Sequence, residues 1–264
     1  MKRIIKILIL AVLHAFYKTV SLVYREKGMA VLMYHSIGNN DHNFMVRPED
    51  FERQIKYLKD HNFKFLKLQD IAQVLEGVPV FEKGVAITFD DGYKDFFDIA
   101  LPILKKYDVS SVLFVHADRK SDNLENELNL MSWEDIKRTK ESGVEIGSHT
   151  YSHPNLKELT EEEIKFEIDK SEEVFQDKLG EIPKTIAYPG GKFTEKIIDA
   201  FKKRGYELGF TIDRGLLKKR ENPFRIKRNG IEKQTSFLEF KIRISGANNW
   251  YENVVNSIKK CFAI

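Results

Sequence analysis

Residues 85–93 read Val85-Ala86-Ile87-Thr88-Phe89-Asp90-Asp91-Gly92-Tyr93, and this stretch decides the fold. Its first five residues are apolar or β-branched, which predicts a short buried strand. The strand ends at Asp90 and Asp91, which point in different directions, so that one can bind a metal while the other transfers a proton. Asp-Asp-Gly is also a common turn sequence, and the stretch alone leaves that interpretation open.

A second stretch, residues 145–153, strengthens the metal interpretation. It reads Glu-Ile-Gly-Ser-His-Thr-Tyr-Ser-His and places His149 and His153 directly after another short apolar strand. Two imidazoles four residues apart are plausible ligands for one borderline metal ion. Together with one aspartate they would make a three-ligand site with room for water; the alternative is a pair of surface histidines.

Composition limits the classes of protein that need considering. The chain has 264 residues, 42% of them hydrophobic, which is enough for the core of one large α/β domain or of two small ones. Lys and Arg number 43 against 40 Asp and Glu, and the charges are interspersed, so we predict no nucleic-acid partner. The single cysteine, Cys261, excludes an internal disulfide and a cysteine-rich zinc cluster.

The first 24 residues differ from the rest of the chain. Basic residues precede an apolar run at residues 4–24, which is long enough to span a bilayer if Lys6 and Lys18 extend toward its surfaces. No Ala-x-Ala cleavage site follows, so residues 1–24 are predicted to be a membrane anchor or uncleaved signal. We therefore expect the protein at the cell membrane, with its main domain outside the cytoplasm, or secreted. A helix lying in the membrane interface and a helix packed on the domain are the alternatives.

Residues 28–264 alternate between predicted strands and helices. This pattern predicts an α/β fold, a distorted or partly open (β/α) barrel of about seven strands. Strands are expected at 30–34, 63–66, 85–89, 110–115, 143–147, 185–188, 207–212 and 224–227, and helices at 48–58, 68–75, 93–106 with a kink at Pro102, 133–141, 160–179, 194–203 and 251–262. Polar residues, among them His35, follow several of these strands, so one shared opening at the carboxyl ends is expected.

Three segments resemble, in order and spacing, the first three motifs of the polysaccharide deacetylase family of metal-dependent carbohydrate esterases, which share the NodB homology domain. The segments are Thr88-Phe89-Asp90-Asp91-Gly92-Tyr93, Ser148-His149-Thr150-Tyr151-Ser152-His153 and Tyr188-Pro189-Gly190-Gly191. The resemblance covers about residues 84–230. Residues 31–37 also resemble the opening segment of the branch that deacetylates poly-N-acetylglucosamine, a biofilm polysaccharide.

The resemblance implies a role for each motif residue. Asp91, His149 and His153 would hold a divalent metal, usually zinc, and Asp90 would be the general base. The turn formed by Tyr188, Pro189 and Gly190 would contact the substrate, with the backbone N–H of Gly190 stabilising the oxyanion of the intermediate.

The sequence departs from the family pattern in two places. No histidine follows His153, so the C-terminal Leu-x-His motif that supplies the acid is missing, and His35 is the expected replacement. The arginine of the third motif is replaced by Ala187, so Arg214 or Arg228 is expected to orient Asp90. Asp213 is either a substitute for the fourth motif or an ordinary turn residue.

These observations predict an enzyme that removes N-acetyl groups from N-acetylglucosamine units of a cell-surface polysaccharide, with poly-β-1,6-N-acetylglucosamine as the expected substrate. A peptidoglycan or chitin deacetylase is the alternative within the family, and an inactive glycan-binding barrel is the alternative outside catalysis. Four aromatic residues are candidates for stacking on sugar rings: Phe44, Trp133, Tyr151 and Tyr188. His116 ends a predicted strand, and a surface or capping role is expected for it, with a position lining the opening of the barrel as the alternative.

Overall fold

The computed structural model describes residues 27–39, 42–79, 81, 83–119 and 129–246. The predicted anchor at residues 1–24 and the predicted helix at 251–262 lie outside these ranges, so both stay predictions. Within the described ranges, none of the helices has the length and apolar character needed to cross a bilayer.

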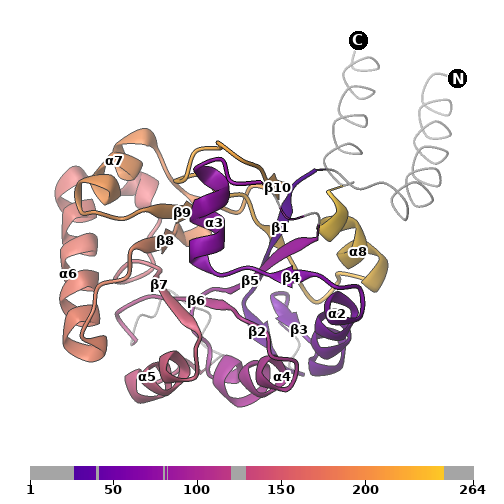
Figure 1. Ribbon diagram of the computed structural model, residues 1–264. Coiled ribbons are helices and arrows are strands. Elements are labelled where there is room, and N and C mark those ends of the chain that lie inside the picture. The colour runs from indigo at the N-terminus through magenta and orange to yellow at the C-terminus, as the bar shows by residue number, and fades with distance from the viewer. Residues whose placement is uncertain (1–26, 40–41, 80, 82, 120–128, 247–264) are drawn as a thin grey trace, which may run out of the picture.

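The centre of the molecule is a strongly curled sheet (Figure 1). Its main path runs β10-β1-β5-β6-β7-β8-β9; β10 is antiparallel to β1, and the other neighbours are parallel. The strands are β1 (Met29–Tyr34), β5 (Gly84–Phe89), β6 (Val112–Val115), β7 (Glu145–Ser148), β8 (Thr185–Ala187), β9 (Leu208–Phe210) and β10 (Leu216–Leu217), with β4 (Lys64–Phe65) beside β5 and β11 (Asn229–Gly230) beside β1. A separate ribbon pairs β2 (Ser36–Ile37) with β3 (Met45–Val46).

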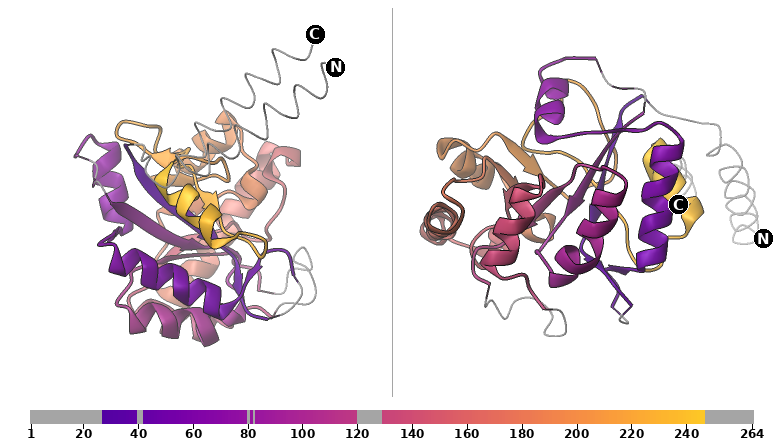
Figure 2. Two further views of the ribbon diagram at one scale, coloured as in Figure 1. Left: turned by 90° about the vertical axis from the view of Figure 1, so that its right-hand side faces the viewer. Right: turned by 60° about the horizontal axis from the view of Figure 1, so that its bottom comes forward.

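Most helices cover the outer face of this sheet, whereas one covers an end (Figures 1 and 2). The apolar side chains of α3, including Ile71 and Val74, pack with Met29 at the start of β1, so α3 closes the amino end of the barrel. The helices are α2 (Pro48–Asp60), α3 (Leu68–Leu75), α4 (Leu101–Lys106), α5 (Trp133–Glu141), α6 (Glu161–Leu179), α7 (Glu195–Lys203) and α8 (Phe237–Ser245).

Side chains alternate between the two faces of the sheet, as the period of a strand requires. In β5, Val85 and Ile87 pack outward with residues of the helices, while Ala86 belongs to a buried cluster inside the barrel. This inner cluster also contains Phe114 and Phe210 and fills the interior. The same alternation places Thr88 and Asp90 on the inner side of the sheet, so the carboxylate of Asp90 lies at the carboxyl end of a filled barrel.

The gap between the two ends of the curled sheet is spanned by residues 226–230. Ile226 forms a bridge to Phe210 of β9, and Asn229 pairs with Leu32 of β1. Arg228 lies between these two contacts. The barrel is therefore partly open in its regular hydrogen bonding but bridged by one irregular segment.

The structure confirms an α/β, partly open barrel and differs from the predicted elements in three places. The strand expected at 224–227 is reduced to the bridge at Ile226. The helix expected at 93–106 is a π-helix, Phe96–Ala100, that continues directly into α4, and Pro102, which has no N–H to donate, lies in the first turn of α4. Helix α8 is not among the elements predicted from the sequence.

We expect Gly147→Ala to destabilise the barrel. A Cβ at position 147 would lie 2.3 Å from Cδ1 of Phe114, which is itself confined by the inner cluster. Because neither side chain can move away, the free energy of unfolding should fall by about 1–3 kcal/mol in urea denaturation. Gly230→Ala is the control, since its Cβ would meet only the flexible end of Met33, and an equal effect of both substitutions would contradict this account.

Candidate metal and acid–base site

Asp91 is turned toward the site by an unusual backbone conformation. Asp90 still continues the sheet, since its N–H donates to the carbonyl of Tyr34 over 3.0 Å. Asp91 and Gly92 then both take left-handed conformations, with φ of 69° and 72°. Glycine is required at position 92, because a Cβ there would lie 2.7 Å from Cγ1 of Val115. The turn thus separates the directions of the two carboxylates, as predicted for adjacent residues.

The two histidines are presented by a loop with the same kind of strain. His149 extends β7, with its N–H donating to the carbonyl of Val115 over 2.9 Å. Thr150 and His153 then adopt left-handed φ values of 69° and 59°, which are uncommon for residues other than glycine. The loop folds back so that the rings of His149 and His153 lie with their centroids 4.9 Å apart.

Asp91, His149 and His153 converge on one point. Asp91 Oδ1 lies 3.4 Å from Nε2 of His149 and 3.5 Å from Nε2 of His153, and one ligand atom from each residue lies within 4.8 Å of the others. These separations exceed those of ordinary hydrogen bonds. Asp91 Oδ1 is accordingly buried without a hydrogen-bond partner among the described residues, as a carboxylate oxygen reserved for a cation would be.

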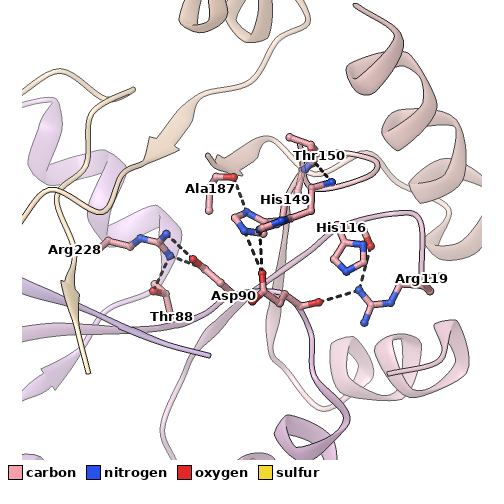
Figure 3. Close-up of polar contacts among 11 residues, drawn as sticks. Thr88, Asp90, His116, Arg119, His149, Thr150, Ala187 and Arg228 are labelled. Atoms are coloured by element: carbon pink, nitrogen blue, oxygen red, sulfur yellow. Dashed lines mark hydrogen bonds and ion pairs between the residues drawn. The ribbon is translucent and has the colours of Figure 1, made fainter. Parts of the chain in front are cut away.

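The protonation of the ligands suits a cation as well. Nδ1 of His149 lies 2.7 Å from the carbonyl oxygen of Ala187 and donates to it, so Nε2 is the ring nitrogen that faces Asp91 and is left to bind a cation (Figure 3). Burial alone would raise the pKa of Asp91, but the contact with His149 and the charges of His35 and His153 bring it below its usual value. The set of one carboxylate and two imidazoles fits zinc and neighbouring divalent metals.

Asp90 is held by a buried arginine from the other end of the domain. Nη1 and Nη2 of Arg228 donate to its two carboxylate oxygens over 2.6 and 2.7 Å (Figure 3). Nε of Arg228 donates to the carbonyl of Thr211 over 2.9 Å. Burial would raise the pKa of Asp90, but Arg228, together with the charges of His149 and His35, outweighs burial, and the pKa lies below its usual value. Asp90 is therefore an ionised carboxylate with a fixed orientation.

The structure distinguishes between the two arginines that the sequence offered as partners of Asp90. Arg228 is fully buried and forms the two-pronged contact with Asp90, whereas Arg214 is an exposed side chain in the loop after β9. Asp213 of the same loop is exposed too. Of the two arginines that were expected to orient Asp90 in place of a third-motif arginine, Arg228 is thus the one in contact with it.

His35 follows β1, next to the end of β5. Its ring stacks on Phe44 with centroids 4.9 Å apart, and Phe44 itself is 39% exposed at the surface. A charge on His35 acts on both Asp90 and Asp91, whose pKa values it lowers. The imidazole is therefore close enough to the site for the acid role that the sequence predicts, a role that stays a prediction.

The turn at residues 188–191 reaches the site through its backbone. The ring of Tyr188 is buried and its hydroxyl donates to the carbonyl of Phe224 over 3.2 Å, so it does not face a substrate. Its N–H is also occupied, by the carbonyl of Phe210. Pro189 is buried, but Gly190 is exposed with a φ of 55°. Gly190 is the part of this turn that a substrate can reach.

The other aromatic candidates divide in the same way. Trp133 packs edge-on against Phe175 at 5.6 Å and belongs to the core, whereas Tyr151 is partly exposed beside Phe166. The expected surface role of His116 is wrong, because the residue is fully buried and burial lowers its pKa to about 3. Its ring lies 6.2 Å from that of His153, so the alternative, a position near the site at the end of β6, is closer to what the structure shows.

Two further residues contact the ligand loops and were missed in the sequence. Arg119 donates to carbonyl oxygens around Asp91, and Glu167 of α6 accepts hydrogen bonds from the loop between the histidines. Both act through backbone groups, for which sequence motifs carry no signal.

Comparison with known proteins agrees with this geometry. The polysaccharide deacetylase family model matches residues 77–209. The chain belongs to the polysaccharide deacetylase family. It is 31% identical over 201 residues to the provisionally named polysaccharide deacetylase YxkH of Bacillus subtilis, covering 76% of this chain and 70% of that protein.

Two further members of the family illustrate its range. The poly-β-1,6-N-acetyl-D-glucosamine N-deacetylase of Staphylococcus aureus is 27% identical over 231 residues, covering 78% of this chain and 80% of that protein. The solved deacetylase PplD of Streptococcus pyogenes, in complex with acetate, superposes with a TM-score of 0.73 at 26% identity, covering 83% of this deacetylase and 98% of PplD.

We expect Arg228→Met to cost about 3–5 kcal/mol of stability at pH 7, because it leaves the carboxylate of Asp90 buried without a partner. In the wild type, the lowered pKa of Asp90 gives stability above pH ~4 that is lost as the pH falls. In the variant, the largest effect opposing burial is removed, so the pKa of Asp90 rises and stability is lost as the pH rises. In urea denaturation, the free energies of unfolding of the wild type and of Arg228→Met should therefore differ less at pH 5 than at pH 7.

Arg214→Met is the matched control, since it removes an exposed arginine from the same part of the chain. Its effect should stay within about 0.5 kcal/mol at both pH values. Equal effects of the two substitutions, or a difference that widens at pH 5, would contradict the assigned pairing of Arg228 with Asp90.

Proposed function

We propose that this deacetylase is metal-dependent and hydrolyses the N-acetyl groups of N-acetylglucosamine units in poly-β-1,6-N-acetylglucosamine. The observation that carries the proposal is the buried, unpartnered Oδ1 of Asp91 facing two imidazole nitrogens, beside an ionised Asp90. The donor set supports zinc as the metal, held by Asp91, His149 and His153. Such a cation supplies Lewis acidity, which polarises an acyl carbonyl and makes water more acidic.

Asp90 acts as the general base in this proposal. Arg228 occupies one lone pair on each carboxylate oxygen, and the remaining lone pairs can accept a proton from the attacking water. The pairing also lowers the basicity of Asp90, so the carboxylate is a suitable base only for an acidified water. Its fixed orientation removes the entropy cost of aligning it for each turnover.

The leaving amine and the oxyanion need donors of their own. His35 is the proposed acid, since an imidazole can donate a proton and His35, directly after β1, is near enough to lower the pKa of Asp90. The backbone N–H of the exposed Gly190 is the proposed donor to the oxyanion, because glycine has no side chain that could cover it.

Two observations support the choice of polymer. The Staphylococcus aureus relative that spans 78% of this chain is named for activity on poly-β-1,6-N-acetylglucosamine. Phe44, which is exposed and stacked on His35, offers an aromatic face next to the proposed acid, where a neighbouring sugar ring can pack. Peptidoglycan and chitin are the competing substrates.

We expect the protein to release acetate from β-1,6-linked N-acetylglucosamine oligomers, and Asp90→Asn to reduce kcat/KM by about 10²–10⁴-fold because the base is lost. Acetate release is the measurement, with β-1,4-linked oligomers tested in parallel. Asp213→Asn is the control and should retain activity. Release from neither the wild type nor Asp90→Asn would favour a glycan-binding barrel, and faster release from the β-1,4-linked oligomers would favour a chitin-type substrate.

We expect His35→Ala to lower kcat by about 10²-fold while the metal content of the purified protein stays unchanged. The imidazole is proposed to donate a proton to the leaving amine and not to bind the cation. His61→Ala, which removes a histidine that stacks on Tyr57 at a helix end, is the control. Loss of metal from His35→Ala, measured by elemental analysis, would show that His35 has been assigned the wrong role.

A further inference from the structure

Arg119 donates hydrogen bonds to several carbonyl groups in and around the turn that carries Asp91. Its guanidinium donates to the carbonyl of His116 over 3.1 Å (Figure 3). It also donates to the carbonyls of Asp91 over 2.9 Å, Gly92 over 2.6 Å and Met131 over 3.1 Å. These hydrogen bonds join the ends of β5 and β6 to the segment before α5. A charged donor is thus directed at main-chain oxygens, two of which belong to the strained turn.

Glu167 accepts hydrogen bonds from N–H groups of the other ligand loop. Its Oε2 accepts from the N–H of Tyr151 over 3.0 Å and of Ser152 over 2.9 Å, and its Oε1 accepts from Oγ of Ser152 over 2.6 Å. The side chain of Glu167 projects from α6 and is only 5% exposed. These donors all lie in the loop between the two histidines.

Both loops need support from outside their own hydrogen bonds. Asp91, Thr150 and His153 are non-glycine residues with positive φ, a conformation that persists only where surrounding contacts hold it. Hydrogen bonds to charged groups are about twice as strong as those between neutral groups. The partly buried guanidinium of Arg119 on the carbonyl side of one turn, and the buried carboxylate of Glu167 on the N–H side of the other, provide that support.

We propose that Arg119 and Glu167 are positioning residues that hold the two ligand loops in the geometry needed for metal binding. This inference rests on the metal site of the proposed function and adds the residues that fix it. Arg119 sets the direction of Asp91 through the carbonyls of the Asp91–Gly92 turn. Glu167 sets the separation of His149 and His153 through the N–H groups between them.

The test measures affinity for Zn²⁺ alone, using full-length protein freed of metal and a competing chromogenic chelator. Arg119→Met and Glu167→Gln should each weaken Zn²⁺ binding by about 10–100-fold, the range typical of lost outer contacts at metal sites. The absorption spectrum of Co²⁺-substituted protein should change as well, because the ligands are no longer held at the same angles. Arg119→Lys keeps the charge but not the planar fork, and should recover part of the affinity.

Glu172→Gln and Arg204→Met are the matched controls. Glu172 lies on the same helix as Glu167 and is 7% exposed, but it pairs with Arg204 instead of a ligand loop. These substitutions should lower the melting temperature of the metal-free protein and leave Zn²⁺ affinity within about threefold of wild type. A general loss of stability is thereby separated from a loss of site geometry.

Wild-type Zn²⁺ affinity and an unchanged Co²⁺ spectrum in Arg119→Met and Glu167→Gln would overturn the inference. If Arg119→Met fails to fold, Arg119→Lys and Glu167→Gln decide it by the same criterion. Absence of Zn²⁺ binding in the wild type would instead refute the metal site of the proposed function, together with any role of these residues toward it.

Discussion

The ion pair between Arg228 and Asp90 is the constraint on which the rest of the structure depends. Both side chains are buried, and neither charge could remain there without the other. Because Arg228 belongs to the segment that spans the gap between β9 and β1, the same contact that orients Asp90 also fixes the last part of the barrel. Closure of the barrel and the ionised state of the proposed base therefore depend on the same contact.

Sequence patterns predicted the features that arise from neighbouring residues. The strand ending at Asp90 and Asp91 and the capping box at Thr160 are local signals, and the structure contains both β5 and α6 where they were expected. Helix α8 shows the limit of such signals. Its Ser236 and Glu239 form a capping box, but Phe240, Ile242 and Ile244 alternate as they would in a strand, so the two local patterns conflict.

Long-range contacts were predictable only as alternatives. Arg214 and Arg228 are equivalent in the sequence, and the choice between them depends on which one the closing segment directs into the barrel, 138 residues away from Asp90. Arg119 and Glu167 could not be predicted, since their partners, apart from the hydroxyl of Ser152, are backbone groups in turns with left-handed residues. Any side chain at the partner positions would offer the same carbonyl or N–H, and so no residue type marks them.

The filled interior of the barrel has a consequence for traffic through the site. α3 covers one end of the barrel, and Phe114 and Phe210 occupy the space between the strands, so the described residues leave no passage along the barrel axis. A sugar polymer would have to lie across the open rim instead of threading inward, so an interior unit could be presented as readily as a chain terminus. Water, glycan and liberated acetate would then enter and leave at the same open end of the barrel.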